Sequence, residues 1–271
     1  MLFLHTLHPS PLLASIGPFV FRWYGLTLAF GALCGFLTLR FFAKRRGWSG
    51  DAALTIFFSV LVMGFIGGRI YHVLNEPTYY AEHPAEIVQV WHGGLAIHGG
   101  LLFGAATLWW FARRWRIPLL HLTDLVAPAI AIGQSIGRWG NYFNQELFGR
   151  PTSLPWGIPI DPANRPPGFE TAEFFHPTFL YESLWELGVF LLLFFLLMRA
   201  TMKRGIATFV YLGLAAFGRL TTESLRIDAT PMFFGIRLPL IVSALLIVVA
   251  IIGLWYCSKR SNGHQTPQGS T

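Results

Sequence analysis

The sequence predicts an all-α, polytopic membrane protein with seven transmembrane helices and a loop region on the outer side. Three observations lead to this prediction. Hydrophobic residues make up 54% of the 271 residues and charged residues only 12%, whereas an ordinary soluble domain carries roughly 25% charged residues. Long apolar segments recur, each near the roughly 20 residues that cross a bilayer. Basic clusters follow every second segment. The composition excludes a disordered, collagen-like or disulfide-stapled chain.

Seven segments are expected to form one transmembrane helix each: Val20–Phe42, Leu54–Leu74, Gly94–Ala112, Leu122–Gly140, Phe179–Met198, Ile206–Thr222 and Leu238–Tyr256. The third, fourth and sixth also contain glycine, polar and charged residues. We expect residues 1–257 to form a single membrane domain. Within it, residues 1–17 form an arm on the membrane surface, because they lack the basic start of a secretory signal. Residues 141–178 form an outer loop region, and residues 258–271 a disordered cytoplasmic tail.

The basic clusters predict the orientation of the chain. Eleven of the 20 lysines and arginines belong to four clusters: Lys44–Arg46, Arg113–Arg116, Arg199–Arg204 and Lys259–Arg260. The positive-inside rule then places the C-terminus in the cytoplasm and the N-terminus outside. This topology explains the net charge of +7. A nucleic-acid-binding protein would gather basic residues with aromatic partners on one folded surface, so no nucleic acid is expected as a partner.

The two cysteines, Cys34 and Cys257, lie far apart in apolar segments. Their spacing matches neither a metal site nor a disulfide framework. Both are interpreted as small buried hydrophobic residues. We expect no metal and no cofactor.

The fourth segment ends in a polar run. If the helix continues through this run, Gln134, Arg138, Asn141 and Gln145 share one face, because they are spaced four, three and four residues apart. An ionisable group inside a span is expensive unless it is paired or lines a wet cavity. Such a face therefore indicates function.

Three further polar segments lie at predicted outer helix ends. They are Arg219, Glu223 and Arg226 of the sixth helix, His176 to Glu182 before the fifth, and His92 to His98 at the start of the third. Together the four segments bring arginines, carboxylates, histidines and amides to one membrane depth. The planar fork of arginine suits a phosphate. A phosphate at the outer leaflet is most simply a phospholipid headgroup.

Structural roles compete with this interpretation. An arginine near a helix end commonly snorkels or forms an ion pair, and this is the main interpretation of Arg22 and Arg69. The charged residues of the sixth helix can equally form an interhelical ion-pair cluster. A structural role also stays open for His98 and is favoured for His92.

The run Gly137–Gly149 closely resembles the signature of the prolipoprotein diacylglyceryl transferases. Four further segments resemble the same family in the same order: Arg22–Gly25, His92–Gly100, His176–Glu182, and Arg219 with Glu223 and Arg226. Together they extend from about residue 17 to residue 257. Two departures are Phe179, where a glutamine is common in the family, and Tyr142, where a phenylalanine is usual. The connection Pro151–Glu173 is shorter than in some relatives.

The resemblance implies a seven-helix enzyme of the bacterial inner membrane with a site on the periplasmic side. The family transfers the sn-1,2-diacylglyceryl group of phosphatidylglycerol to the lipobox cysteine of a prolipoprotein, and glycerol 1-phosphate is released. The implied partners are phosphatidylglycerol, the lipobox peptide of a prolipoprotein and membrane lipids.

For this chemistry we expect His98, Arg138 and Arg219 to be catalytic. The two arginines hold the phosphate, and His98 removes the thiol proton, although the arginines alone could also lower the thiol pKa. Further residues are expected to bind or surround the phosphatidylglycerol headgroup: Tyr24, Asn141, Asn144, Glu146, Gly149, Tyr181, Glu223 and Arg226. Among them, Glu146 and Glu223 would orient the arginines.

Two other function classes need cations at headgroup depth. A phospholipid transporter or flippase would have a polar path to the cytoplasmic side and often inverted repeats, and neither is evident. A membrane phospholipase would use water as the acceptor. No nucleophilic serine motif or metal-ligand set supports it, but the sequence alone does not exclude water.

Overall fold

The computed structural model describes residues 2–17, 19–199 and 202–259. Its elements, with η for short 3-10 helices, are α1(Leu2–Thr6), β1(Leu12–Ile16), β2(Phe19–Arg22), α2(Trp23–Arg45), α3(Gly50–Asn75), α4(Pro77–Glu82), η1(Pro84–Val88), η2(Val90–His92), α5(Ile97–Arg114), α6(Leu119–Phe143), β3(Ile158–Pro159), η3(Pro162–Asn164), β4(Phe174–Phe175), α7(Thr178–Met198), α8(Ile206–Glu223), β5(Met232–Phe233), β6(Ile236–Arg237) and α9(Leu238–Lys259). The chain divides into two compact units: unit 1 spans Met1–Gly35 and Ala127–Thr271, and unit 2 spans Phe36–Val126.

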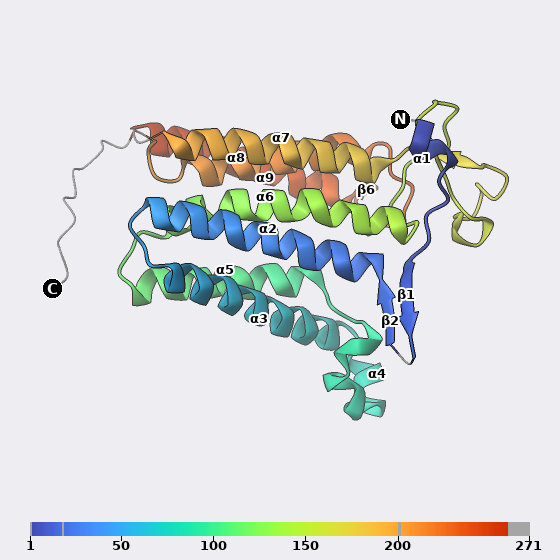
Figure 1. The fold of residues 1–271 in the computed structure, drawn as a ribbon, viewed down its shortest axis with the longest axis horizontal. Helices are drawn as coiled ribbons and strands as arrows, with labels where there is room; N and C mark the ends of the chain where they lie inside the picture. Colours follow the sequence, from blue (N-terminus) through green and yellow to red (C-terminus); the bar gives the residue numbers. More distant parts are fainter. Residues whose placement is uncertain (1, 18, 200–201, 260–271) are drawn as a thin grey trace. The chain divides into compact units, whose positions relative to one another are not determined.

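Seven long helices occupy the seven predicted segments (Figure 1). Five of them, α2, α3, α6, α7 and α9, are long and apolar enough to cross a membrane. The chain is therefore a mostly helical, multi-pass membrane protein. The other two, α5 and α8, contain 18 residues each. That they also span the bilayer remains a prediction.

The first long helix starts later than predicted. Residues Phe19–Arg22 form strand β2 rather than a helix, and α2 begins at Trp23. Strand β2 pairs antiparallel with β1, with Ile16 opposite Phe19. Hydrogen bonds between the strands satisfy these backbone groups, so the apolar residues before Trp23 do not extend the helix.

The third long helix also starts later, at Ile97 instead of Gly94. Gly93 and Gly94 have φ values of +93° and +77°. This left-handed conformation is incompatible with a continuing α-helix and favours glycine. At the other end of the chain, most of the tail predicted to be disordered lies outside the described residues. Its first two positions, Ser258 and Lys259, are the last residues of α9.

In unit 1, α8 packs against both α7 and α9 (Figure 1). The α7–α8 contact is close because the Trp185 indole lies directly over Gly218, and its Nε1 donates to the Leu214 carbonyl at 2.8 Å. Helix α6 contacts the first part of α2, where Gly133 faces Gly31. The end of α6, the start of α7 and the end of α8 thus come together within this unit.

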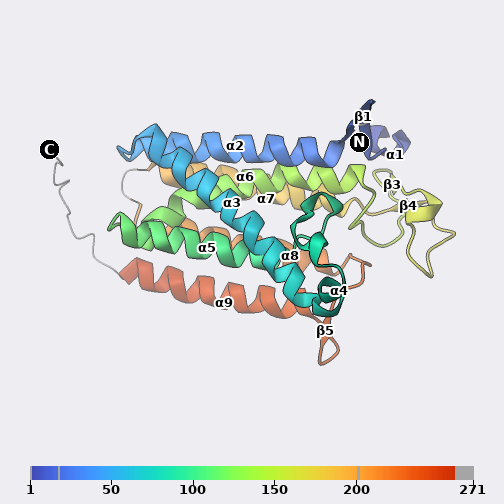
Figure 2. The ribbon, with the colours of Figure 1, turned by 90° about the horizontal axis from the view of Figure 1, so that it is seen from below.

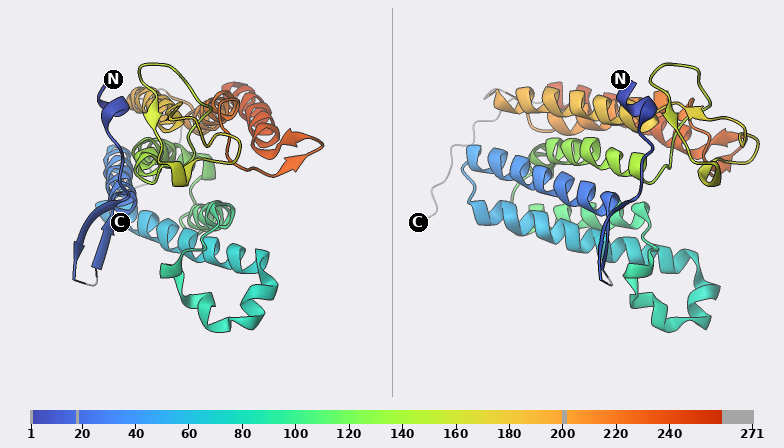
Figure 3. Two further views of the ribbon diagram at one scale, coloured as in Figure 1. Left: turned by 90° about the vertical axis from the view of Figure 1, so that its right-hand side faces the viewer. Right: turned by 45° about the vertical axis from the view of Figure 1, so that its right-hand side comes forward.

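Residues 144–177 of unit 1 form a folded loop region with its own core. In this core Phe148 and Phe175 are at most 7% exposed, and Tyr142, from the end of α6, belongs to the same cluster and is 2% exposed. Strand β3 pairs with β4, with Ile158 opposite Phe175. The N-terminal helix α1 packs against β3 (Figure 3), and the His5 ring stacks on Phe174 with centroids 4.0 Å apart. The predicted outer location of this region stays a prediction.

In unit 2, α3 and α5 lie side by side (Figures 1 and 2). Their closest approach is at Gly67 and Gly99, where a Cβ on Gly99 would overlap the Gly67 carbonyl. Small residues of this kind let two helix backbones meet. The connection from α3 to α5 contains α4, η1 and η2.

Candidate active site

A network of arginines and carboxylates lies where α6, α7 and α8 of unit 1 meet. Glu182 of α7, which is 5% exposed, is at its centre. One carboxylate oxygen, Oε2, lies 3.0 Å from Arg138 Nη1. The other, Oε1, lies 3.3 Å from Arg219 Nη1 and 3.6 Å from Arg226 Nη1, and accepts a hydrogen bond from Thr222 at 3.0 Å. One carboxylate therefore links three arginines.

Glu223 is the second link of this network. Its Oε2 lies 2.7 Å from Arg219 Nη2, and its Oε1 accepts a hydrogen bond from Arg237 Nε at 2.6 Å. Arg237, the last residue of β6, also donates to Thr230 Oγ1 at 2.6 Å and to the Asp228 carbonyl at 3.0 Å. The β5–β6 hairpin is thus fastened to the end of α8.

Asp228 is the third carboxylate. Its Oδ1 accepts a hydrogen bond from Arg226 Nε at 2.7 Å and lies 3.8 Å from Arg237 Nη2. Burial works to raise the pKa of Asp228. The hydrogen bond and charge of Arg226, together with the charge of Arg237, outweigh burial and hold that pKa below its usual value. Asp228 is therefore ionised at neutral pH.

The network has a net positive charge, because four guanidinium groups meet three carboxylates. Its arginines differ in accessibility. The side chains of Arg138 and Arg219 are each 26% exposed, whereas that of Arg226 is 3% exposed. Arginine forks make paired, charge-assisted hydrogen bonds to phosphate. Arg138 and Arg219 both contact Glu182 and keep this exposure, whereas Arg237, which is 25% exposed, contacts Glu223 and Asp228 instead.

Helical spacing explains part of this arrangement. Arg219 and Glu223 are four residues apart in the last turns of α8, so their side chains meet on one face. Glu182 lies in the second turn of α7, and that helix is fastened at its start because Thr178 Oγ1 donates to the Leu147 carbonyl. The contacts between helices come from the packing of α6, α7 and α8.

The predicted headgroup residues near the end of α6 lie together. Asn141 Nδ2 donates to Glu146 Oε1 at 2.7 Å, and Asn144 directly follows the helix. The Tyr24 ring lies over Gly140, where a Cβ would come within 2.7 Å of the ring. Glu146 thus contacts an amide here, whereas Glu223 contacts arginines.

Gly149 joins three chain segments. It forms a backbone bridge with Arg226, and its N–H donates to the His176 carbonyl at 2.9 Å. A Cβ at this position would lie 2.8 Å from the His176 Cβ and 3.0 Å from the Thr178 Cγ2. Only glycine lets these segments approach, so Gly149 acts here on the position of Arg226.

The helical face predicted from Gln134 to Gln145 is too long, because α6 ends at Phe143. Gln145 has a φ of +51° and is 4% exposed. Its amide nitrogen donates to the Pro9 carbonyl at 2.8 Å and to Asp161 Oδ2 at 2.7 Å. The placement of Gln145 on the polar face of the helix is wrong. This residue ties the N-terminal segment to the loop region.

Tyr181 is tied to the loop region. Its hydroxyl accepts a hydrogen bond from Trp156 Nε1 at 2.9 Å and lies 3.1 Å from His176 Nδ1. Burial lowers the pKa of the His176 imidazole, so the folded protein favours its neutral form. Tyr181 and His176 together connect the start of α7 to the loop.

Five polar residues of unit 1 received no individual role from the sequence: Glu182, Glu186, Tyr211, Asp228 and Arg237. Tyr211 donates to Gln134 Oε1 at 2.9 Å. Glu186 is 8% exposed, and its Oε2 has no hydrogen-bond partner among the described residues. A signal for the two glutamates was present, because they stand four residues apart within a predicted span, where carboxylates are expensive.

His98 lies in unit 2, as the second residue of α5. Its side chain is exposed, and its ring lies beside that of Tyr71 on α3, with centroids 5.8 Å apart and an interplanar angle of 34°. The arginine network belongs to unit 1.

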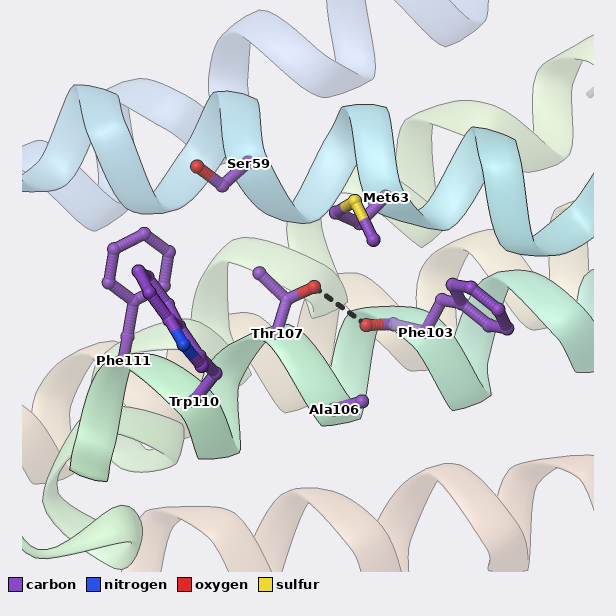
Figure 4. Close-up of a pocket in the computed structure, with 7 residues that line it drawn as sticks. All are labelled: Ser59, Met63, Phe103, Ala106, Thr107, Trp110 and Phe111. Carbon is purple, nitrogen blue, oxygen red and sulfur yellow. Dashed lines mark hydrogen bonds between the residues drawn. The ribbon is translucent and has the colours of Figure 1, made fainter. Parts of the chain in front are cut away.

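Unit 2 also contains an apolar cavity of about 470 Å³ between α3 and α5 (Figure 4). Its lining residues are Ser59, Met63, Phe103, Ala106, Thr107, Trp110 and Phe111. The Thr107 hydroxyl donates to the Phe103 carbonyl at 2.7 Å, so it is satisfied within its own helix. None of these lining residues is ionisable. The cavity therefore offers neither a base nor a grip for phosphate.

A family model for prolipoprotein diacylglyceryl transferase matches residues 11–256 of the chain. The chain belongs to this family. Three similar proteins are each named phosphatidylglycerol–prolipoprotein diacylglyceryl transferase. The one from Trichormus variabilis is 43% identical over 259 residues, which cover 93% of this chain and 92% of the relative. The one from Synechococcus elongatus is 44% identical over 270 residues, covering 96% and 92%.

The third of these relatives, from Fervidobacterium nodosum, is 40% identical over 255 residues, covering 91% of this chain and 86% of the relative. The resemblance based on five short motifs is thereby confirmed as membership of the prolipoprotein diacylglyceryl transferase family. The match includes both the arginine network and the segment that contains His98.

Proposed function

We propose that this protein transfers the sn-1,2-diacylglyceryl group of phosphatidylglycerol to the lipobox cysteine of a prolipoprotein, the first step of bacterial lipoprotein maturation. The observation that carries the proposal is the partly exposed, net positive arginine network around Glu182. Membership of the family and the names of the relatives support the same reaction. The protein is then a transferase with two substrates, a lipid and a protein.

Arg138 and Arg219 are proposed to hold the phosphate of the lipid. Both guanidinium groups contact Glu182, at 3.0 and 3.3 Å, and both keep about a quarter of the side chain exposed. This arrangement presets two forks before the lipid arrives, so little reorganisation is needed when charge develops on the leaving group. Glu223 contacts Arg219, and Arg226 contacts Glu182, so these two residues are proposed to hold the site in position.

The reaction breaks one bond and forms one. The thiolate sulfur attacks the glyceryl carbon that bears the phosphate, a carbon–sulfur bond forms, and the carbon–oxygen bond to the phosphate breaks. The electron pair of that bond leaves with glycerol 1-phosphate. The thiol proton must be removed first, because the thiolate is the nucleophile and an ordinary cysteine has a pKa of about 8.5.

His98 is proposed as the base that removes this proton, since an imidazole suits proton transfer near neutral pH. Its exposed ring at the first turn of α5 is accessible to a substrate. Tyr24, Asn141, Asn144 and Glu146 are proposed to surround the headgroup. Tyr181 and Gly149 are proposed to contribute by shaping the loop region next to it.

We further propose that the protein lies in the bacterial inner membrane, with the N-terminus in the periplasm and the C-terminus in the cytoplasm. The basic clusters support this orientation, because each begins in the last turn of α2, α5 or α9 or directly after α7. The arginine network then lies on the periplasmic side, since it gathers at the opposite ends of the unit 1 helices.

The deciding experiment mixes the purified protein with phosphatidylglycerol and a peptide containing a lipobox cysteine. Mass spectrometry should detect a peptide with a thioether-linked diacylglyceryl group, together with glycerol 1-phosphate. Free diacylglycerol without a modified peptide would instead identify a phospholipase. No chemical change to the lipid, combined with movement of labelled lipid across vesicles, would identify a transporter.

A further inference from the structure

Arg69 of α3 is a buried arginine of unit 2 whose partners are backbone carbonyls. It is 8% exposed. Its Nε donates to the Ile87 carbonyl at 2.9 Å, its Nη1 to the Gly93 and Gly94 carbonyls at 2.8 and 2.9 Å, and its Nη2 to the Glu86 carbonyl. The guanidinium carbon also lies 5.2 Å from the Tyr80 ring centroid. This side chain holds the α3–α5 connection at four points.

The positive charge of Arg69 is compensated in an unusual way. A buried cation is commonly paired with a carboxylate, but among the described residues Arg69 forms no such ion pair. Arg69 contacts the backbone carbonyl of Glu86, and the carboxylate of Glu86 accepts a hydrogen bond from the Tyr79 hydroxyl at 2.7 Å instead. Arg69 therefore fixes the geometry of the loop. Each of its three guanidinium nitrogens already donates to a carbonyl, so the group is not set up to bind a phosphate.

We infer that Arg69 is a positioning residue that sets the location of His98. Two of the four clamped carbonyls belong to Gly93 and Gly94, five and four residues before His98. Both glycines have positive φ values, and a Cβ on Gly94 would lie 2.5 Å from Arg69 Nη1. The clamp thus needs glycine at this position to close.

The start of α5 depends on contacts from α3 because it lacks a cap of its own. Its N-cap residue, Ala96, provides no side-chain hydrogen bond, and an uncapped helix start is less stable. The Ala96 N–H donates instead to the Gly68 carbonyl at 3.0 Å, Gly99 packs on Gly67, and Tyr71 lies beside the His98 ring. Arg69 completes this set by fixing the residues that lead into the helix.

The inference rests on the proposed role of His98 and is tested with a double-mutant cycle. Transfer to a lipobox peptide is measured for wild type, Arg69→Lys, His98→Gln and the double variant. Lysine keeps the charge but lacks the fork that reaches several carbonyls. We expect Arg69→Lys to lower kcat about 10- to 100-fold, the cost of a misplaced catalytic group, with little change in KM for phosphatidylglycerol. In the His98→Gln background the same change should alter kcat by less than about 3-fold.

Arg113→Lys is the matched control, because Arg113 lies in the same unit, is exposed and stacks on Trp109 at 5.2 Å. It should keep wild-type transfer. If the effects of Arg69→Lys and His98→Gln multiply, Arg69 acts independently of His98 and the inference is overturned.

A second measurement does not depend on activity. Amide hydrogen exchange of peptides covering residues 86–101 should become faster in Arg69→Lys and stay unchanged in Arg113→Lys. Unchanged exchange in Arg69→Lys overturns the clamp itself. If the exchange is faster but wild type transfers no lipid, the clamp stands and the proposed function fails.

Discussion

The two units use arginine in opposite ways. In unit 1, Arg138 and Arg219 contact carboxylates and remain 26% exposed, and the network around them has one positive charge more than it has negative charges. In unit 2, Arg69 is 8% exposed and donates to four backbone carbonyls. The same side chain therefore presents a charged surface in one unit and holds a loop in the other.

The difference shows which property decides the role of an arginine near a membrane. Arg138 and Arg219 are more exposed than Arg69, and their partners explain the difference. Carboxylates can orient a guanidinium by one edge and leave another edge for a ligand, whereas several carbonyls from one loop occupy the whole fork.

The largest effect is expected for Arg138→Ala. Removal of one of two phosphate-holding forks should lower kcat about 10³-fold, because donors aimed at developing charge have effects of this order. Transfer to a lipobox peptide and membrane insertion are both measured. Insertion should be normal, since α6 keeps its apolar residues. Full turnover by this variant would show that the phosphate binds elsewhere and would remove the contrast with Arg69.

His98→Gln should lower kcat about 10²-fold, the usual contribution of a positioned base. Transfer to a lipobox peptide is measured for wild type and the variant across pH. Near-normal activity at every pH would mean that the arginines alone lower the thiol pKa, and unit 2 would then contribute no reacting group.

Glu182→Gln should lower kcat about 10-fold and also destabilise unit 1. Glutamine keeps an acceptor for Thr222 but removes the charge that orients three arginines, and an ion pair that loses one partner leaves uncompensated charge. A fall in the midpoint of thermal unfolding of about 5 °C is expected. Glu86→Gln in unit 2 is the control and should leave both quantities unchanged. Arg69 contacts the backbone carbonyl of Glu86, which the substitution does not alter. An equal effect of both substitutions would contradict the comparison.

The smallest effect concerns His176, whose ring contacts the Tyr181 hydroxyl and whose carbonyl accepts a hydrogen bond from the Gly149 N–H. Burial lowers its pKa in the folded protein, so stability is present above the unfolded pKa of about 6.5 and is lost as pH falls below it. The midpoint of thermal unfolding should drop by about 1–2 °C between pH 7.5 and 5.5. His176→Gln should remove that part of the pH dependence. An unchanged slope in the variant would assign it to another group.

Much of the fold follows from the sequence because five of the long helices have an apolar stretch of membrane length. All seven helices lie where they were predicted, and the errors are at their ends. The start of the first helix was predicted too early, because an apolar run such as the one around Val20 can form a strand as well as a helix. The third was misplaced because a run with two glycines allowed the chain to turn before Ile97.

The site was predictable only in part. Arg138, Arg219 and Glu223 could be identified because charges within spans are costly and because the spacing of the last two is helical. Arg237 could not be identified from spacing, since a hairpin brings it to α8, and Asp228 lies in the irregular segment between α8 and that hairpin. The carbonyl partners of Arg69 were equally hidden, because backbone groups have no signature in a sequence. Arg69 was predicted to snorkel or to form an ion pair, and neither role includes contacts with loop carbonyls.

Gln145 and its neighbours have a practical consequence for protein production. The N-terminal segment is fastened to the loop region by His5, by the Leu7 carbonyl, which accepts a hydrogen bond from Tyr142, and by the Pro9 carbonyl, which accepts one from Gln145. An affinity tag or a fusion partner placed at the N-terminus would disturb these contacts. Two of the residues that make them, Tyr142 and Gln145, lie within seven positions of Arg138 in the sequence. A tag that follows α9 leaves them intact, so purification for lipid-transfer assays is best done from the C-terminal end.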